Sequence, residues 1–422
     1  MIVKVLGKTA LAIVASFIGV GIGMGAAQAG EPIERSGNVY HQAVCSREIE
    51  PGEARCFAHI RVDAHGNPFI GNPDSRTGTP SGYSPSSLWS AYFGGTQTPL
   101  TLGGTVVAIV DAYGYANAAS DLAVYRAQYG LGPCSTGCFK QVNQTGVSGN
   151  YPRYNAGWAQ EQALDLDMVS AMCPKCSIIL VEAKSASFSD LNAAVAEAAV
   201  LGAKVISNSY GGADSASTNY DVAEPAYKNA AKAGVAVTAS AGDSGYGAQF
   251  PATSEYTIAV GGTSLTTTSN GGWSNIVWSG TGSGCSSLIA QPSWQSYTSN
   301  PNMYSTYNGT KCPNRVETDI SAVADPATRV AVYGPSGSGT RSAWLVFGGT
   351  SVASPLIGGM IGTKGGVSPG TIGPEHIWTN APTGLNDVTG GPTNGTCVSF
   401  CSAQVGYDAP SGNGTPSGTA AF

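Results

Sequence analysis

The sequence predicts an α/β protein with one parallel sheet covered by helices on both faces, in a single large domain. From Tyr83 onward, short continuous apolar runs alternate with longer helical runs. Strands without a polar face are typical of a parallel sheet that is buried on both sides. The roughly 340 residues beyond residue 80 favour one large domain over two.

The elements are expected in a regular order along the chain. A short helix opens at residues 84–89, and the apolar run at residues 105–111 forms a strand that ends in Asp111. Beyond it we expect helices at 121–129, 158–172, 189–200 and 222–232, and strands at 177–181, 204–207 and 235–239. Residues 246–345 are less regular, with turns and hairpins expected.

The amino-terminal segment predicts export. An uncharged run from Thr9 to Gly30 follows two lysines and ends in the small residues Ala27-Gln28-Ala29. This pattern is typical of a signal peptide over residues 1–29, which would make the mature protein secreted. The alternative is an uncleaved membrane anchor, because the run is about long enough to span a bilayer. No later segment has comparable apolar length, so we expect no stable membrane association after cleavage.

The composition excludes one class of partner. Charged residues make up 11% of the chain, against roughly 25% in ordinary soluble domains, and the formal net charge is −6. A chain with few cations and a negative balance is not expected to bind nucleic acid. A surface with few ionisable groups also changes its charge little as the pH falls, which suits a protein working in acid.

The ten cysteines fall into short-range pairs. An even number of cysteines in an exported chain indicates disulfides. A four-cysteine zinc site formed by Cys134, Cys138, Cys173 and Cys176 is the alternative. The natural pairs are Cys45/Cys56, Cys134/Cys138, Cys173/Cys176, Cys285/Cys312 and Cys397/Cys401.

Residues 30–80 differ from the rest of the chain, and we call them the leader. They contain three of the four histidines, one cysteine pair and a polar Gly/Pro-rich stretch from Gly66 to Gly82. This composition predicts a short leader joined by a flexible linker to a main domain over residues 81–422.

A serine near the carboxyl end is a candidate nucleophile. Ser351 follows Gly348-Gly349-Thr350, and the apolar run after Pro355 is expected to be a buried helix with that proline in its first turn. A helix N-terminus favours developing negative charge, and glycines let a substrate approach closely. The alternative is a Ser/Thr helix cap after a glycine turn.

Four acids are candidate partners of this serine. Glu161 and Asp165 lie four residues apart on one face of the predicted 158–172 helix, where two close carboxylates can share a proton. Asp243 follows the 235–239 strand, and Asp111 ends the first core strand. The alternatives are a solvated acidic helix face for the pair and a turn-forming role for Asp243.

Histidine is scarce in this part of the sequence. Only His376 lies beyond residue 65, and its neighbours Gly373-Pro374-Glu375 do not form a glycine-flanked histidine motif. A Ser-His-Asp triad needs an imidazole close to the nucleophile. If Ser351 is a nucleophile, its base must therefore be a carboxylate.

These motifs together resemble the sedolisins, the serine-carboxyl peptidases. The resemblance runs from about Tyr83 to the carboxyl end, and the motifs occur in the family's order. It implies a subtilisin-like fold in which a glutamate replaces the catalytic histidine. The motifs are Glu161-x-x-x-Asp165, Ser207-Asn208-Ser209-Tyr210-Gly211, Ser240-x-Gly242-Asp243-Ser244-Gly245, Phe250-Pro251-Ala252, Val260-Gly261-Gly262-Thr263, and Gly349-Thr350-Ser351 with Pro355.

The resemblance also implies a role for each residue. Ser351 resembles the nucleophile, Glu161 its general base and acid, and Asp165 the partner that shares the proton of Glu161. Asp243 resembles the acid that donates a hydrogen bond to the oxyanion, and Asp111 is expected to be structural. An extended substrate would pair with the backbone of Ser209, Tyr210 and Gly211.

A calcium loop is expected near the carboxyl end, holding one structural Ca²⁺. Oxygen ligands suit this hard cation. The family usually has glycine at the position of Gln404 and tryptophan at that of Tyr407. Two turn aspartates without a metal are the alternative. The ligands implied by the resemblance are the side chains of Asp387 and Asp408 and the carbonyls of Val388, Gln404 and Gly406.

The expected function is a secreted, monomeric serine endopeptidase that hydrolyses polypeptides at acidic pH. Sedolisins usually carry a long folded propeptide, and residues 30–80 are too few for that domain. A non-catalytic, calcium-stabilised exported binding protein on the same fold is therefore the alternative. A serine esterase is a third hypothesis, and such an enzyme would lack the Ser209–Gly211 edge.

Overall fold

The computed structural model describes residues 31–70, 80–94, 99–134, 137–215, 220–295, 312–337, 341–367, 370–396 and 400–422. The predicted signal peptide and part of the predicted linker lie outside these ranges. Residues 31–422 form one unit by their internal contacts. Among the helices of the described ranges, none combines the length and apolarity that a membrane span requires.

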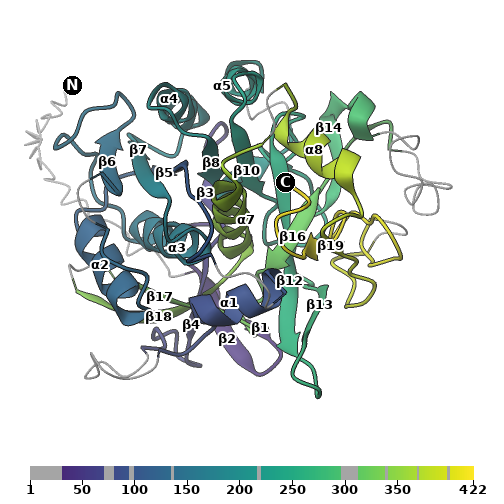
Figure 1. The fold of residues 1–422 in the computed structure, drawn as a ribbon, viewed down its shortest axis with the longest axis horizontal. Coiled ribbons are helices and arrows are strands. Elements are labelled where there is room, and N and C mark those ends of the chain that lie inside the picture. Colours follow the sequence, from purple (N-terminus) through teal and green to yellow (C-terminus); the bar gives the residue numbers. More distant parts are fainter. Residues whose placement is uncertain are drawn as a thin grey trace, which may run out of the picture. The chain divides into compact units, whose positions relative to one another are not determined.

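The central sheet has eight strands and is parallel except at one edge (Figure 1). The antiparallel edge strand is β13, which pairs with β12, and β16 adds to β12 in parallel. The fold class predicted from the sequence is confirmed. The strands are, in spatial order, β13 (Trp273–Val277), β12 (Ile258–Thr267), β10 (Ala236–Ser240), β8 (Val205–Asn208), β5 (Val106–Ala112), β7 (Ser177–Ala183) and β6 (Phe139–Asn143), with β16 (Ile320–Val323) beside β12.

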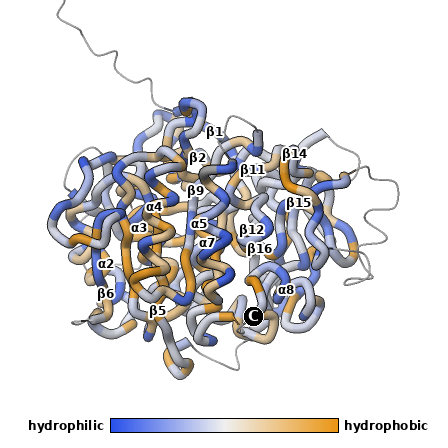
Figure 2. The backbone as a smooth tube through the Cα atoms, turned by 90° about the horizontal axis from the view of Figure 1, so that it is seen from above, coloured by the Kyte–Doolittle hydropathy of each residue, from blue (hydrophilic) through white to orange (hydrophobic). Residues whose placement is uncertain are grey.

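Helices cover both faces of this sheet because each central strand is apolar on both sides. Val107 and Ile109 of β5 pack in the core cluster that contains α3 (Ala156–Met172) and α7 (Thr350–Lys364). Ala108 and Val110 of the same strand pack in a second cluster with α4 (Phe188–Val200) and α5 (Tyr220–Lys232). Alternate residues thus face opposite helix layers, as the pleat of a strand requires. Figure 2 shows the apolar residues along α3 and α7.

Local capping explains where the helices begin. Asn155 and Ser187 accept hydrogen bonds from backbone N–H groups in the first turns of α3 and α4. Helix α7 begins at Thr350, after Gly349 with φ 98°. The expectation that Pro355 lies in the first turn is therefore wrong, because the helix starts one turn earlier and places Ser351 in that turn. The other helices are α1 (Pro85–Tyr92), α2 (Ala118–Gln128), α8 (Gly373–Asn380) and the 3₁₀ turn η2 (Ser293–Gln295).

The leader is built into two further sheets, which its composition did not indicate. In the first, β1 (Glu34–Ser36), β2 (Val39–Ala43) and β4 (His59–Val62) continue into β18 (Ser342–Gly348) and β17 (Val330–Pro335), all antiparallel. In the second, β3 (Arg55–Cys56) pairs with β9 (Tyr210–Ala213), which also pairs with β11 (Gln249–Phe250). Residues 31–62 thus share hydrogen bonds with the main domain.

Four of the five predicted disulfides are present. Cys45–Cys56, Cys134–Cys138, Cys173–Cys176 and Cys285–Cys312 are bonded, so the alternative of a four-cysteine zinc site is wrong. Cys401 is also disulfide-bonded, and Cys397 lies outside the described residues. Two small hairpin-like pairs complete the fold: β14 (Gly284–Ala290) with β15 (Asn314–Glu317), and β19 (Leu385–Asn386) with β20 (Thr415–Pro416).

Candidate active site

Ser351 lies at the junction between β18 and α7. Gly349 precedes the helix with a positive φ, and a side chain there would meet two atoms of the site. A Cβ atom at position 349 would lie 2.0 Å from the Phe57 carbonyl oxygen and 2.6 Å from Asp243 Oδ2. Glycine is therefore required both for the turn and for the close approach of another chain segment. Ser351 itself is fully buried.

Glu161 and Asp165 face this serine from α3, which packs against α7. Both side chains are 0% exposed, so the alternative of a solvated acidic face is excluded. Ser351 lies near enough to the Glu161 carboxyl group to lower its pKa, while the Ser351 hydroxyl itself donates to the Ser209 carbonyl at 3.2 Å. Asp165 Oδ1 accepts a hydrogen bond of 2.8 Å from the Ser209 hydroxyl, which fixes its orientation. The spacing of four residues thus brings the two carboxyl groups to the nucleophile together.

The two carboxyl groups are close enough that each influences the pKa of the other. Glu161 Oε1 and Asp165 Oδ2 are buried, and no N–H or O–H group of the described residues donates to them. Burial raises the pKa of each group well above its ordinary value. For Glu161, the second cause is the charge of Asp165. Two neighbouring carboxyl groups with raised pKa values are an arrangement that suits a shared proton.

Asp243 follows β10 and reaches the N-terminus of α7. Its Oδ1 accepts hydrogen bonds from the Thr350 backbone N–H at 2.8 Å and the Thr350 hydroxyl at 2.7 Å. Its Oδ2 is buried and receives no donor from the described residues. Burial raises the pKa of Asp243 to about 7, so in acid Oδ2 carries a proton that it can donate. Asp243 Oδ2 lies 3.4 Å from His59 Nε2 of the leader, and the side chain is fully buried.

Asp111 lies in the same buried cluster, although the sequence indicated a structural role. It ends β5 and is 0% exposed, and neither carboxyl oxygen has a hydrogen-bond partner among the described residues. Burial, followed by the charges of Glu161 and Glu182, raises the pKa of Asp111 well above its ordinary value. Asp111 therefore adds a third buried carboxyl group with a raised pKa to the surroundings of the Glu161–Asp165 pair.

The predicted substrate edge is occupied by the leader. Arg55 and Cys56 pair antiparallel with Gly211 and Tyr210, so β3 adds one strand to β9. The next residue, Phe57, donates its backbone N–H to the Ser209 carbonyl at 3.2 Å and to Ser351 Oγ at 3.1 Å.

The leader continues past the serine on the other side. The backbone N–H of Ala58 donates to Glu161 Oε2 at 3.0 Å. His59 and Ile60 then pair antiparallel with Gly348 and Phe347 of β18. An extended peptide therefore crosses the whole site, held by backbone hydrogen bonds before and after Ser351.

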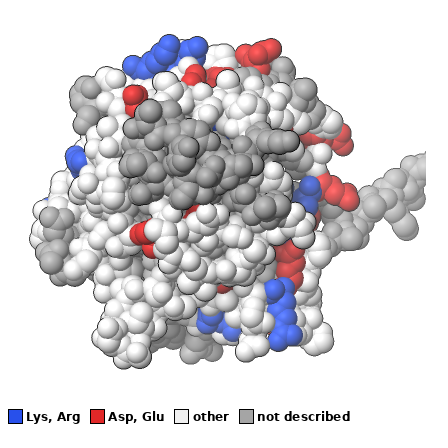
Figure 3. Space-filling model, turned by 90° about the vertical axis from the view of Figure 1, so that its right-hand side faces the viewer, with Lys and Arg blue, Asp and Glu red and all other residues white. Residues whose placement is uncertain are grey.

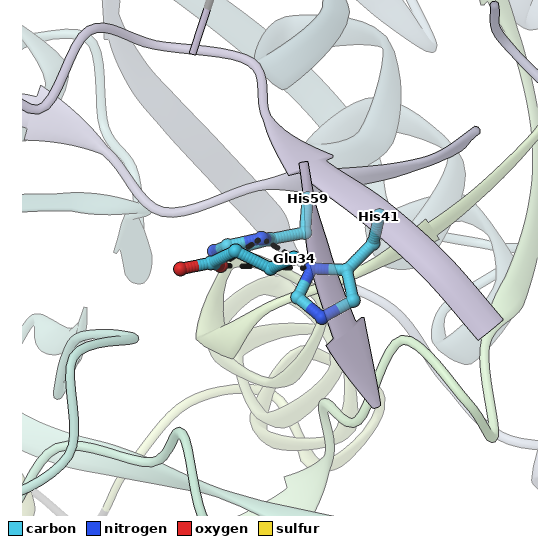
Figure 4. Close-up of side chains that lie close together, drawn as sticks. All are labelled: Glu34, His41 and His59. Atoms are coloured by element: carbon cyan, nitrogen blue, oxygen red, sulfur yellow. Dashed lines mark hydrogen bonds and ion pairs between the residues drawn. The ribbon is translucent and has the colours of Figure 1, made fainter. Parts of the chain in front are cut away.

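Three leader side chains, Glu34, His41 and His59, lie close together (Figure 4). His59 Nδ1 lies 2.9 Å from His41 Nδ1, and Glu34 Oε2 lies 3.7 Å and 3.8 Å from these two atoms. On its other side, His59 Nε2 is 3.4 Å from Asp243 Oδ2. Burial lowers the pKa of both histidines, most strongly that of His59. The Arg47 guanidinium pairs with Glu34 Oε2 at 2.6 Å, so a positive charge already balances the Glu34 carboxylate.

No imidazole serves as the base of Ser351 in the described part of the chain. His59 faces Asp243, and the Ser351 hydroxyl donates to the Ser209 carbonyl. His376 lies on α8 and is bonded to Asn380. The expectation that a carboxyl group must take this place is consistent with the geometry.

The residues of the predicted calcium loop come together near the carboxyl end. The N–H of Gly406 donates to Asp387 Oδ2 at 2.8 Å, and that of Gln404 donates to Asp408 Oδ2 at 3.0 Å. Both carboxylates therefore converge on the segment 404–406. Burial, which is the main cause, and the charge of Asp387 raise the pKa of Asp408 to about 7. Two carboxylates on one segment supply oxygen ligands of the kind that calcium takes in proteins. Tyr407 is buried with its ring 4.5 Å from that of Trp378, so tyrosine fills this position.

Sequence comparison supports the resemblance. A model of the subtilase family matches residues 154–366. Kumamolisin of Bacillus sp. (strain MN-32) is 30% identical over 374 residues, which cover 82% of this chain and 64% of kumamolisin. Sedolisin of Pseudomonas sp. (strain 101) is 28% identical over 377 residues, with coverages of 80% and 60%. The chain thus spans less than two thirds of the length of these relatives.

Structural comparison gives the same result. Pseudomonas sedolisin, a serine-carboxyl proteinase complexed with two molecules of pseudo-iodotyrostatin, superposes with a TM-score of 0.63 at 25% identity. This match covers 80% of our chain and 96% of that structure. Sphericase superposes with a TM-score of 0.51 at 18% identity and covers 82% and 99%, which supports the fold alone. From these matches and the motifs that line the site, the chain belongs to the subtilase family and, within it, to the sedolisins.

Proposed function

We propose that this protein is an endopeptidase that cleaves polypeptides in acid through an acyl-enzyme on Ser351. The observation that carries the proposal is the peptide bond between Phe57 and Ala58. The nitrogen of this bond donates to Glu161, and its carbonyl oxygen lies at Gly349 beside Asp243. A nucleophile, a proton carrier and a donor for the oxyanion thus surround one peptide bond.

The chemistry follows from these contacts. Ser351 Oγ attacks the carbonyl carbon and gives its proton to Glu161, whose basicity is set by the proton shared with Asp165. The tetrahedral oxyanion accepts a hydrogen bond from protonated Asp243 Oδ2, near the N-terminus of α7. Glu161 then protonates the leaving nitrogen, and the C–N bond breaks. In the second half, water gives a proton to Glu161 as its oxygen attacks the ester carbon, and Glu161 returns a proton to Ser351 Oγ as the ester bond breaks.

The substrate class follows from how the peptide is held. Backbone pairing with β9 precedes the bond and pairing with β18 follows it. A site that binds chain on both sides of the bond suits internal cleavage of a polypeptide, and a serine esterase would not need these two edges. On the face shown in Figure 3, charged side chains are few and of both signs, which agrees with a substrate other than nucleic acid.

Calcium and secretion complete the proposal. One Ca²⁺ would be held by the carboxylates of Asp387 and Asp408 with carbonyls of Val388, Gln404 and Gly406, and it would stabilise the loop without taking part in catalysis. Disulfides at both ends of the described chain suit an oxidising, extracellular compartment. We expect the secreted protein to act as a monomer.

Digestion of a denatured protein at pH 3–5 tests this function. We expect the parent protein to release peptides and Ser351→Ala to release none. This substitution removes a single hydroxyl group and changes the packing of the core little. The rival hypothesis, a non-catalytic binding protein, predicts no digestion by either protein. If Ser351→Ala released peptides at the same yield as the parent protein, a group other than Ser351 would perform the cleavage.

A further inference from the structure

The leader shows how an extended peptide lies in the site before the bond at Ser351. The Phe57 N–H donates to the Ser209 carbonyl, and Arg55 pairs antiparallel with Gly211 two residues earlier. Side chains alternate between the two faces of an extended segment, so Arg55 and Phe57 point to the same side. A substrate bound by the same backbone contacts would place the first and third residues before its bond at these two positions.

The Phe57 ring packs against both the site and Arg55. Phe57 is 1% exposed, and a Cβ atom at Gly211 or Gly242 would lie 2.9 Å or 3.7 Å from its ring. The central carbon of the Arg55 guanidinium lies 5.2 Å from the centroid of the same ring, which is the distance of a cation–π contact. The residues at the first and third positions before the bond therefore touch each other.

The polar end of Arg55 reaches the residue that follows Asp243. Arg55 Nη2 donates to Ser244 Oγ at 2.9 Å, and Ser244 is exposed at the rim of the site. No ion pair among the described residues involves Arg55. Burial raises the pKa of Asp243 to about 7, so this neighbour carries no charge in acid. The guanidinium is then held by a hydroxyl group and an aromatic ring.

We infer that Ser244 is a specificity-determining residue, which selects substrates with arginine at the third position before the bond and an aromatic residue at the first. The inference rests on the proposed function and names a substrate class for that site. Arginine suits this place better than lysine, because its planar guanidinium stacks on a ring while its N–H groups still donate at the edge. Since arginine contacts both Ser244 and the ring, the preferences at the two positions are coupled.

Four fluorogenic peptides test this selection with the secreted protein at pH 4. They carry arginine or methionine at the third position before the bond, and phenylalanine or leucine at the first. We expect arginine to raise kcat/KM over methionine ~10-fold beside phenylalanine and only ~3-fold beside leucine. The gain should lie in KM, because the contact exists before the bond reacts. A fifth peptide, with lysine beside phenylalanine, should stay within ~3-fold of its methionine counterpart.

Variants of the enzyme identify the residue that selects. Ser244→Ala should reduce the preference for arginine beside phenylalanine from ~10-fold to ~3-fold and leave kcat/KM for the methionine peptide unchanged. Ser244→Thr keeps the hydroxyl group and should retain the preference. Ser148→Ala is the matched control, because Ser148 is an exposed serine after β6 whose hydroxyl donates to the Gln141 carbonyl. Unchanged melting temperatures verify folding.

The outcomes are distinct. Hydrolysis of the arginine and methionine peptides at the same kcat/KM would overturn the inference and leave the proposed function standing. A preference for arginine that Ser244→Ala leaves intact would also overturn it, since another group would then select. Equal gains from lysine and arginine would show that charge alone is recognised, and equal gains beside leucine and phenylalanine would overturn the coupling. If neither the peptides nor a denatured protein is hydrolysed, the proposed function is refuted and the selection with it.

Discussion

The residues of the site exchange protons because burial has removed the solvent that would hold charge on them. Glu161, Asp165 and Asp111 are each 0% exposed, and burial raises the pKa of all three carboxyl groups. Three adjacent carboxylates could not all be ionised in such surroundings. The cluster therefore holds protons under conditions in which exposed carboxyl groups have lost theirs, and Glu161 accepts or donates a proton according to the step.

The first prediction at this scale concerns the proton-transfer unit. Ser351→Ala and Glu161→Gln should each lower peptide hydrolysis at acidic pH by at least ~10³-fold, because one variant lacks the nucleophile and the other its base. The double variant should be no slower than either single variant, since the two side chains act in one step. Steady-state hydrolysis of a fluorogenic peptide measures this. Glu197→Gln on α4 is the control, and additive losses would contradict the shared step.

The second prediction concerns the pH limit of activity. Asp243 donates to the oxyanion only while protonated, and burial raises its pKa to about 7. Activity should therefore be present in acid and fall as the pH rises through this value. Asp243→Asn keeps a donor that does not titrate, so its lower activity should fall less steeply toward neutral pH. An optimum above pH 7 in the parent, or the same alkaline limb in the variant, would contradict this role.

The sequence predicted the site's own residues better than their surroundings. Glu161 and Asp165 could be found because helical spacing places them on one face, and Ser351 because glycines and a helix precede and follow it. The contact of Phe57 with Ser351 spans 294 positions, and no local pattern encodes it. The sequence also could not place Asp111, because a strand-ending acid looks the same whether it faces solvent or a buried carboxyl pair.

At the scale of elements, strand addition connects the leader to function. Strand β4 lies between β2 of the leader and β18, which leads directly into Gly349 and Ser351. The alternation of apolar strands and helices predicted the central sheet, because that sheet is made by local patterns. It did not predict the leader strands, because Glu34–Ser36 and Arg55–Cys56 are short and polar and are strands only through their partners.

The third prediction concerns how acid affects this docking. His41 and His59 are buried and 2.9 Å apart, and burial lowers the pKa of both below the ordinary 6.5. A released leader binds protons on these imidazoles below pH ~6.5 while the docked leader does not. Docking is therefore fully stable above that pH and loses stability as the pH falls below it. Glu34 and Asp325 oppose the lowering of the pKa of His41, whereas Arg47 lowers the pKa of both histidines further. Arg55 also lowers the pKa of His59, and Asp243 lies beside that ring.

Hydrogen exchange at the Val39–Ala43 amides measures this docking in Ser351→Ala, which lacks the proposed nucleophile. We expect protection to decrease from pH 7 to pH 5 after correction for the intrinsic exchange rate. His41→Asn/His59→Asn removes both titrating groups and should flatten this dependence. His65→Asn, an exposed leader histidine, is the matched control. Equal pH dependence in the double variant and the parent would show that the histidines do not set the release.

At the scale of the whole molecule, the carboxyl end closes the fold against the central sheet. Ser321 of β16 donates to the Ser411 carbonyl at 3.0 Å, and the Asn413 side chain donates to the Asp319 carbonyl at 3.0 Å. Phe422 packs in the same core cluster as α3 and α7. The predicted calcium loop lies within this closing segment, so order in the loop supports order in the catalytic core.

The last prediction concerns calcium and global stability. An ion that binds only the folded chain stabilises it by about 2.7 kcal/mol when its free concentration is 100 times its Kd. EDTA should therefore lower the melting temperature by several degrees. Asp387→Ala and Asp408→Ala should each reproduce the loss and abolish the response to EDTA, because both carboxylates converge on residues 404–406. Asp221→Ala, at an exposed position of α5, should melt like the parent with and without EDTA. Calorimetry at pH 6 gives these values, and a melting temperature that EDTA leaves unchanged in the parent would count against the ion.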